Sequence, residues 1–466
     1  MSISMTAARP GVEPEVPTLA EATHVWAKIG LLSFGGPAGQ IALMHKELVE
    51  DRRWIGEQRF LHALNYCMLL PGPEAQQLAT YIGWLMHRTR GGLIAGLLFV
   101  LPGAVVMLGL SILYALYRHV PFIDAMFFGV KAAVLAVVVE AVMRIGKRAL
   151  KNRTMIGIAV AAFIGIYILQ VPFPLIILAA GFVGWLGSYV APQLFTGAGH
   201  GGKGAPDFDG IIDRMFERGL LAHTRPSFRG TCRSLMLGLP LWLMPVFLLW
   251  LLAGPTAVWT QIGTFFSTMA VVTFGGAYAV LAYVAQAAVD TFGWLAPGEM
   301  ADGLGLAETT PGPLIMVLQF VGFFAAYRNP GMFDPVVAGC LGAALTTWVT
   351  FAPSFLFIFV GGPYSEALRG NRKVSAVLSA ITAAVVGVVV NLALWFGLHV
   401  MFREVRSLDI FGVGPDIPVL TSINWPAFAL SALAIFAMLR LKTGMIPTLA
   451  GCAIAGLLLK LPGAWF

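Results

Sequence analysis

The chain alternates between long apolar stretches and short polar segments over most of its length. Apolar windows of about 20 residues predict transmembrane helices, because a backbone in hydrocarbon must satisfy its amides within the segment itself. The pattern therefore predicts an all-α polytopic membrane protein with about 13 transmembrane helices. The predicted spans are 25–45, 60–87, 91–117, 122–143, 154–170, 172–191, 235–253, 257–289, 300–327, 333–361, 374–400, 426–440 and 443–461.

Composition supports this class. Apolar residues make up 58% of the chain and charged residues 11%, and the mean hydropathy is +0.81. In soluble domains, apolar residues make up roughly 45–50% and charged residues about 25%. Residues 1–23 are polar and lack the apolar core of a cleavable signal peptide, so they form an N-terminal tail. The net charge of +7 comes from Lys and Arg in short loops, which membrane topology explains better than a nucleic-acid partner.

Catalytic and metal motifs are missing from the sequence. Cys67, Cys232, Cys340 and Cys452 form no CxxC pair, and no His stands at metal-ligand spacing. The chain also has no HExxH, GxSxG or P-loop pattern. We therefore expect no metal, no cofactor and no enzymatic activity.

One unit of sequence occurs twice. The copies match at the FGG triplet (Phe34, Gly35, Gly36 and Phe274, Gly275, Gly276), at Trp54 and Trp294, and at the PGP triplet (Pro71, Gly72, Pro73 and Pro311, Gly312, Pro313). Every pair is separated by the same distance, since 274 − 34 and 311 − 71 both equal 240. Beyond an insertion in the second copy, Pro102 aligns with Pro353. The whole unit is duplicated.

The span at 235–253 has no partner in the first copy. Equivalent spans are therefore an odd number of crossings apart, and the sequence predicts two repeats of inverted topology, as in many secondary transporters. The predicted organisation is a cytoplasmic tail at 1–23, a first membrane repeat at 24–191, a basic Gly-rich cytoplasmic linker at 192–234, an unpaired linking helix at 235–256 and a second repeat at 257–466.

Positive charge sets the predicted orientation. Lys and Arg gather at 144–153 and in the central linker, which places the N-terminus in the cytoplasm and the C-terminus in the periplasm. The loop at 46–59 disagrees, because it carries four basic residues on the predicted outside. Two explanations remain open: four acidic residues in the same loop offset the charge, or the first FGG span is re-entrant.

The PGP triplets interrupt otherwise apolar spans, so each of these helices must break there. A break at membrane depth is tolerated where it is buried in protein or lines a cavity. A half-helix that starts at Pro73 or Glu74 presents free amides to an anion, although a kink for packing is the alternative. The glycine pairs of FGG form either a second backbone opening or a close helix contact.

Polar residues beside the breaks are concentrated in the first copy. Asn65, Glu74 and Gln77 stand where the second copy has Gly305, Leu314 and Val317. Lys131 lies in an apolar stretch, where a charge costs at least about 2.5–3.5 kcal/mol on insertion scales. It either attracts an anionic substrate or pairs with a carboxylate such as Glu74 or Asp124. Glu74 and Glu308 are candidate proton carriers, with a helix-dipole partner as the alternative for Glu74.

The segments SFGGPAGQIALMHKELVEDRRW and LLPGPEAQQLATYIGW, repeated as TFGGAYAVL and TTPGPLIMVLQFVG, closely resemble the chromate ion transporter (CHR) family in its long two-domain form. The resemblance covers nearly the entire chain. It implies efflux of the chromate dianion across the bacterial inner membrane, chromate resistance, and sulfate as a look-alike. Many members of the family have a histidine shortly after FGGP. This chain has Gln40 there, with His45 as the nearest substitute.

The resulting hypothesis is a transporter that holds a tetrahedral oxyanion between the PGP half-helices while the repeats rock. The predicted binding residues are Phe34, Gly35, Gly36, Asn65, Pro71, Gly72, Pro73, Glu74, Gln77, Lys131, Gly275, Gly276, Pro311, Gly312 and Pro313. The alternatives are a sulfate or other oxyanion permease and, from another class, an intramembrane enzyme or sensor. The expected partners are a small inorganic oxyanion and the lipid bilayer, and a homodimer is compatible with the sequence.

Overall fold

A computed structural model of the chain describes residues 16–34, 36–195, 210–274, 277–296, 298–365, 372–407 and 414–460. Gly35, Gly275, Gly276 and most of the Gly-rich part of the predicted linker lie outside the described residues. The described part is almost entirely helical. One two-stranded antiparallel ribbon pairs β1 (Val405–Ser407) with β2 (Asp416–Pro418).

The first half of the chain forms a series of short helices followed by long ones. They are α1 (Leu19–Leu32), α2 (Gly36–His45) with the π-helical η1 (Lys46–Asp51), α3 (Glu57–Cys67), α4 (Glu74–Tyr117), α5 (Pro121–Ala149), α6 (Arg153–Tyr167), α7 (Phe173–Val190) and α8 (Pro192–Phe195). The linker contributes α9 (Ile211–Glu217) and η2 (Ala222–Thr224), and α10 (Phe228–Ala253) follows.

The second half repeats this order. It contains α11 (Val258–Val272), α12 (Ala277–Gln286) with the π-helical η3 (Ala287–Thr291), α13 (Glu299–Thr309), η4 (Leu314–Met316), α14 (Val317–Arg328), α15 (Pro335–Gly361), η5 (Gly362–Tyr364), α17 (Arg372–Met401), η6 (Leu420–Ser422), α18 (Trp425–Leu439) and α19 (Met445–Lys460). Both copies even place a π-helix after the helix that follows FGG.

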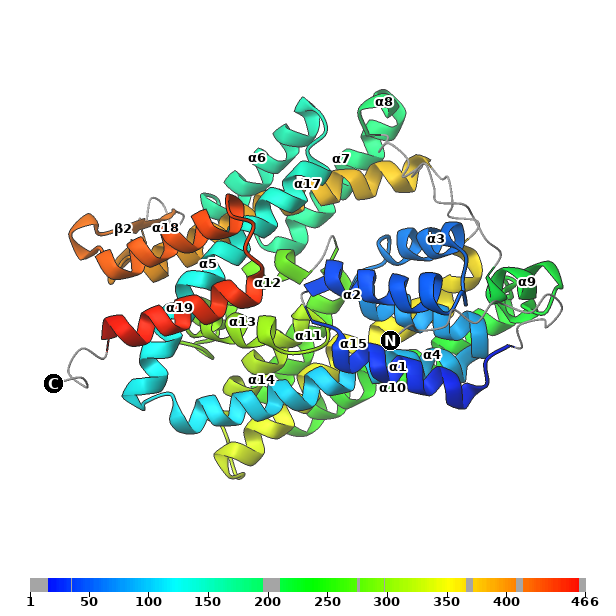
Figure 1. Cartoon of the computed structure of the whole chain (residues 1–466), viewed down its shortest axis with the longest axis horizontal. Helices are drawn as coiled ribbons and strands as arrows, with labels where there is room; N and C mark the ends of the chain where they lie inside the picture. The colour runs from blue at the N-terminus through cyan, green and yellow to red at the C-terminus, as the bar shows by residue number, and fades with distance from the viewer. Residues whose placement is uncertain are drawn as a thin grey trace, which may run out of the picture.

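Within the described residues, six helices are long and apolar enough to cross a bilayer, namely Glu74–Tyr117, Pro121–Ala149, Phe173–Val190, Phe228–Ala253, Pro335–Tyr364 and Lys373–Met401. Shorter apolar helices accompany them, among them α6, α18 and α19. The protein is therefore an all-α, multi-pass membrane protein. Figure 1 shows α5 with α18 and α19 on one side of the molecule and α1, α2 and α3 with α9 on the other.

The helix α4 is a hairpin rather than one rod. His87 and Arg88 leave helical geometry, and Arg88 has φ of 53°. A Cβ atom on Gly83 would lie 2.5 Å from the carbonyl oxygen of Gly91, and one on Gly92 would lie 3.0 Å from that of Thr80. The segments before and after the turn therefore run antiparallel in close contact, which only small residues permit. In the second copy, α14 and α15 pack in the same way through Gly322 and Gly342.

The broken spans of the second copy return to the side from which they start. Glu299, the first residue of α13, is bound at 2.8 Å by Arg328, the last residue of α14. Trp259 at the start of α11 packs edge-on against Phe333, just beyond α14. The helices on both sides of FGG and PGP thus start and end close together. The PGP turn forms the tip of one hairpin, and the described residues that flank FGG form the tip of another.

The first copy has the same arrangement. His87, at the end of the first arm of α4, contacts the carbonyl oxygen of Pro17, which precedes α1, at 2.8 Å. The linker contacts the loop before α3 and the end of the first arm of α4. The amide of Ile212 donates to the carbonyl oxygen of Trp54 at 2.9 Å, and His223 contacts the carbonyl oxygen of Trp84 at 3.0 Å. The loop at 46–59 therefore lies on the same face as the linker.

Candidate functional site

The PGP turn of each repeat is hydrogen-bonded to the FGG region of the other. The amide of Gly72 donates to the carbonyl oxygen of Thr273 at 2.8 Å, and the amide of Gly312 donates to that of Ser33 at 2.8 Å. The two bonds occupy equivalent positions, because 312 − 72 and 273 − 33 both equal 240. Gly72 and Gly312 have φ of 114° and 90°, which glycine adopts without strain.

Each PGP turn also packs against the long helix of the other repeat. A Cβ on Gly72 would meet Oγ of Ser354 on α15 at 2.8 Å, and a Cβ on Gly103 of α4 would overlap the carbonyl oxygen of Pro311. Gly103 and Ser354 directly follow the aligned Pro102 and Pro353. The four broken helices therefore meet at one centre, where the freed backbone groups of one repeat are satisfied by the other.

Buried amide side chains surround this centre. Gln77 donates to the carbonyl oxygen of Pro71 at 2.7 Å, Gln40 to that of Gly312 at 2.5 Å, and Gln319 to that of Ala104 at 2.9 Å. The Oε1 atoms of Gln40, Gln77 and Gln319 have no hydrogen-bond partner among the described residues. A buried acceptor without a partner costs about 1–3 kcal/mol of stability. Packing alone therefore does not explain why these three glutamine side chains lie here.

The structure separates several residues that the sequence grouped together. Gln77 is fully buried beside Pro71, whereas Asn65 is exposed on α3. Glu74 begins α4 and lies near Arg148, while Phe34 is 40% exposed. Pro73 and Pro313 stand immediately before the half-helices, as the sequence predicted.

A cavity of about 340 Å³ reaches the tips of the hairpins. Gly36, Tyr278 and Glu308 line its inner part, and Tyr278 donates a hydrogen bond to Oε1 of Glu308 at 2.6 Å. Its outer part is lined by Glu140 and Arg144 of α5, which form an i,i+4 ion pair at 3.7 Å, by residues 442–444 between α18 and α19, and by Met445 at the start of α19. The sequence singled out Gly36 and Glu308 but not Tyr278, which no local motif marks.

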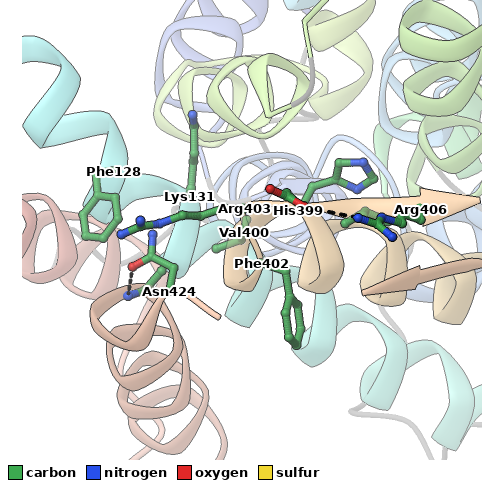
Figure 2. A pocket seen from close by; sticks show the side chains of 11 residues that line it. Phe128, Lys131, His399, Val400, Phe402, Arg403, Arg406 and Asn424 are labelled. Atoms are coloured by element: carbon green, nitrogen blue, oxygen red, sulfur yellow. Dashed lines mark hydrogen bonds and ion pairs between the residues drawn. The ribbon is translucent and has the colours of Figure 1, made fainter. Parts of the chain in front are cut away.

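Lys131 lies far from the PGP turns. It lines a second cavity of about 750 Å³ with His399 near the end of α17, Arg403 just after this helix and Arg406 of β1 (Figure 2). Its ammonium group lies 3.3 Å from Asp302 in the first turn of α13, whereas Pro311 lies beyond the other end of this helix. Of the pairings considered from sequence, neither forms: the partner is Asp302, and Asp124 binds Lys460 at 2.8 Å instead.

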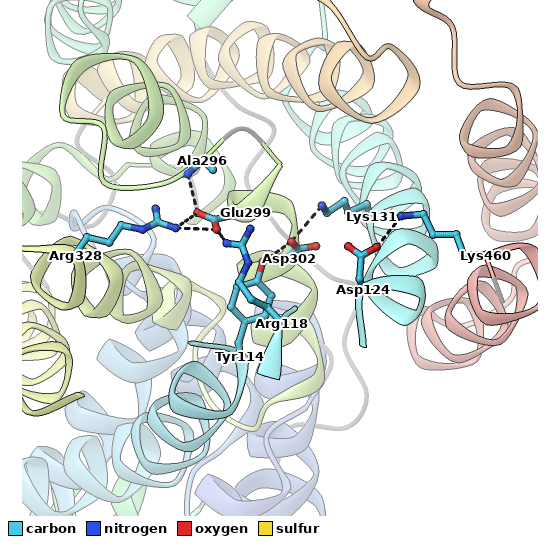
Figure 3. A network of polar contacts seen from close by, with 9 residues as sticks. All are labelled: Tyr114, Arg118, Asp124, Lys131, Ala296, Glu299, Asp302, Arg328 and Lys460. Atoms are coloured by element: carbon cyan, nitrogen blue, oxygen red, sulfur yellow. Dashed lines mark hydrogen bonds and ion pairs between the residues drawn. The ribbon is translucent and has the colours of Figure 1, made fainter. Parts of the chain in front are cut away.

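A charged network closes the base of the second pair of hairpins (Figure 3). Glu299 is paired with Arg118 at the end of α4 and with Arg328 at 2.8 Å, and it accepts a hydrogen bond from the amide of Ala296 at 2.7 Å. Asp302 accepts a hydrogen bond from Tyr114 at 2.7 Å in addition to its contact with Lys131. Both carboxylates are 2% exposed, so they depend on these partners.

In the first repeat, a residue of the linker supplies the carboxylate that corresponds to Glu299. Position 59, which aligns with Glu299, is an arginine. Asp213 of α9 supplies the carboxylate: its Oδ1 binds Arg59 at 2.5 Å, and its Oδ2 accepts a hydrogen bond from the amide of Gly56 at 2.6 Å. Gly56 aligns with Ala296, so the linker caps the same amide that Glu299 caps in the second repeat. Sequence comparison of the repeats did not reveal this replacement, because Asp213 lies outside both.

The described residues contain no group of three or more His, Cys, Asp or Glu side chains that could hold a metal ion. The four cysteines are free.

Comparisons with known proteins place both repeats in one family. The family model for the chromate transporter matches residues 20–185 and 260–457. The chromate transport protein of Pseudomonas aeruginosa is 31% identical over 367 residues, which cover 78% of this chain and 77% of the relative. The probable chromate transport protein of Synechococcus elongatus is 27% identical over 85% of this chain and 88% of its own length. The chromate transport protein of Cupriavidus metallidurans is 26% identical over 80% and 81%. No solved structure matches the chain.

Proposed function

The chain belongs to the chromate transporter family, and we propose that it exports chromate, a tetrahedral oxyanion dianion, from the cytoplasm across the bacterial inner membrane and so confers chromate resistance. The observation that carries the mechanism is the reciprocal docking of the two PGP turns at one centre. The alternative is a permease for sulfate or another inorganic oxyanion, which has the same charge and shape.

We infer two inverted repeats with re-entrant hairpins rather than 13 full crossings. The FGG and PGP spans each start and end on one face, so they enter the membrane and return. Among the described residues, nine helices then cross: the second arm of α4, then α5, α6, α7, α10, α15, α17, α18 and α19. The second arm of α4 and its counterpart α15 are five crossings apart. Because five is an odd number, the two repeats still have opposite orientations in the membrane. The basic loop at 46–59 then lies in the cytoplasm, which favours re-entry over charge compensation.

This topology suggests how alternating access works. The first pair of hairpins enters from the cytoplasmic face and the second pair from the periplasmic face, and their tips meet near the middle. The network of Glu299 and Asp302 closes the periplasmic base, whereas the cavity beside Glu308 reaches the tips from the opposite side. The described conformation therefore corresponds to a cytoplasm-facing state, and export requires the network to open.

At the centre, the substrate would sit between the PGP turns, with the free amides of the half-helices and Gln77 as donors. Glu308 is the better placed of the two candidate proton carriers, because it lines the cavity while Glu74 does not. Lys131 would act at the periplasmic network instead of at the tips.

Export of a dianion does not require coupling. A membrane potential of 100 mV, negative inside, contributes about 2.3 kcal/mol per charge, so a dianion gains about twice that on leaving the cell. Coupling to protons becomes necessary for uptake.

Flux measurements in proteoliposomes test the assignment. Chromate and sulfate uptake into inside-out vesicles should increase with an imposed potential that is positive inside the vesicle. The variants Lys131→Ala and Glu74→Gln separate the roles of the network and of the first PGP turn. Absence of flux for both ions in the parent chain would overturn the oxyanion assignment. Turnover of a substrate in detergent, without a vesicle barrier, would support an enzyme instead.

A further inference from the structure

The cavity beside Glu308 is built from both repeats. Gly36 comes from the first hairpin tip, Tyr278 and Glu308 come from the second pair of hairpins, and Arg144 comes from α5. Lys442 belongs to the turn between α18 and α19. At about 340 Å³ the cavity has the volume of roughly ten water molecules, so it can hold a small ion with part of its hydration shell.

Two cations at the outer part of the cavity are available to an anion. Arg144 has Glu140 as its only ion-pair partner among the described residues, and at 3.7 Å this pair leaves most guanidinium donors uncommitted. No carboxylate within the described part of the chain pairs with Lys442. Lys442 has φ of 55°, a left-handed conformation that costs free energy in a residue other than glycine. This turn holds the lysine at the cavity despite that cost.

The inner part supplies donors of a different kind. The helix α2 begins at Gly36, and its first amides have no partner within the helix. The hydroxyl of Tyr278 donates a hydrogen bond to Glu308, so this carboxyl group already has a partner inside the cavity. An ionised carboxylate in the same cavity repels an anion, so Glu140 and Glu308 offset part of the attraction of the two cations. Such a site binds an anion weakly enough to release it onward.

We propose that this cavity is the cytoplasmic entry site for the oxyanion, with Arg144, Lys442 and the amino end of α2 as its ligands, and that Glu140 and Glu308 limit its affinity. The proposal rests on the proposed transport function. It assigns a separate, earlier binding step to residues that do not belong to the FGG or PGP motifs, apart from Gly36.

Equilibrium binding of radiolabelled sulfate to the purified full chain in lipid nanodiscs tests the ligands. Arg144→Gln and Lys442→Gln should each raise the dissociation constant about tenfold, the loss expected for one charge-assisted hydrogen bond. Glu308→Gln should lower it severalfold. The matched controls are Lys147→Gln and Arg440→Gln, which remove an exposed cation near each ligand but outside the cavity. They should leave binding unchanged.

A second measurement does not alter the proposed ligands. Thr443, which lines the cavity, is replaced by cysteine in a chain whose four native cysteines are serine. An anionic, membrane-impermeant thiol reagent should label it from the cytoplasmic face, and sulfate should slow the labelling where chloride at equal ionic strength does not.

The outcomes separate the two proposals. A parent chain that transports neither chromate nor sulfate contradicts the proposed function. A parent that transports either ion, combined with unchanged binding in Arg144→Gln and Lys442→Gln, contradicts the entry site alone. Labelling of Thr443→Cys only from the periplasmic face, or labelling that sulfate does not slow, contradicts it as well.

Discussion

The backbone amide of Gly72 donates a hydrogen bond to the carbonyl oxygen of Thr273 at 2.8 Å, across the boundary between the two repeats. The equivalent bond joins Gly312 to Ser33 at the same length. A broken helix leaves amides and carbonyls without partners, and in a membrane those groups must find partners within the protein. The reciprocal bonds satisfy them and fix the register of one repeat against the other.

Substitution of either PGP glycine should strongly impair transport. Gly72→Ala and Gly312→Ala place a side chain at φ of 114° and 90°, and in Gly72→Ala the new Cβ also meets Ser354. We expect each to cost roughly 1–3 kcal/mol of stability and to lower chromate flux more than tenfold. Gly109→Ala is the control, because a Cβ there meets nothing within 4 Å. Flux equal to that of the control would contradict a role for the turns.

Removal of the Glu299 charge should weaken the network at the base of the second pair of hairpins. Its side chain is 3% exposed and is paired with two guanidinium groups that are about a third exposed. Glu299→Gln should therefore destabilise the chain by roughly 2–3 kcal/mol, less than for a fully buried pair, and lower the thermal midpoint in detergent. Asp124→Asn breaks an exposed pair with Lys460 and should change stability by less than about 1 kcal/mol. Equal midpoints for the two variants would argue against a structural network at Glu299.

Asp213 should hold the linker on the first repeat. Asp213→Asn weakens the contacts with Arg59 and the amide of Gly56, so trypsin should cleave the linker severalfold faster in the purified chain. Glu217→Gln, on the same short helix but exposed, is the matched control. Unchanged cleavage in Asp213→Asn would show that the buried Ile211 and Ile212 hold the linker without it.

Docking of the linker should weaken in acid. Burial is the main cause that lowers the pKa of His223 below its usual 6.5, and Arg88 adds to it. The Nδ1 atom of His223 is buried without a hydrogen-bond partner, so protonation is unfavourable while the linker is docked. Because the released form binds the proton more readily, the stability from docking is present above pH 6.5 and is lost as the pH falls below it.

Trypsin is unsuitable over this pH range, so hydrogen exchange at residues 211–224 is the readout. Exchange should accelerate below pH 6.5 after correction for the intrinsic rate, and His223→Gln should remove that dependence while keeping a donor for the carbonyl oxygen of Trp84. The same acceleration in His223→Gln would assign the effect to another group.

Re-entry of the FGG span predicts the sidedness of the loop after it. Asp51→Cys, in a chain without native cysteines, should react with an impermeant thiol reagent from the cytoplasm, as Lys147→Cys does in either topology. Asp334→Cys should react from the periplasm. Labelling of Asp51→Cys from the periplasm would instead show that the first FGG span crosses the membrane completely.

The class of the protein and its duplication follow from the amino-acid sequence. Apolar windows of membrane length require helices, and the constant separation of Gly72 from Gly312 and of Trp54 from Trp294 requires a repeat. It also predicted that Pro71 and Pro311 break their helices, because the loss of an amide donor is a local property.

The course of the broken spans and the pairing of the charges depend on contacts between distant parts of the chain. Periodicity cannot tell a helix that crosses from a hairpin that returns, because both are apolar over the same length. The contact between Glu299 and Arg328, which brings the start of α13 beside the end of α14, favours a hairpin. Lys131 pairs with Asp302, and Asp213 replaces a carboxylate missing from the first repeat, although these partners are 171 and 154 positions apart along the chain. Contacts between residues so distant in sequence are set by the packing of whole helices, which no local pattern encodes.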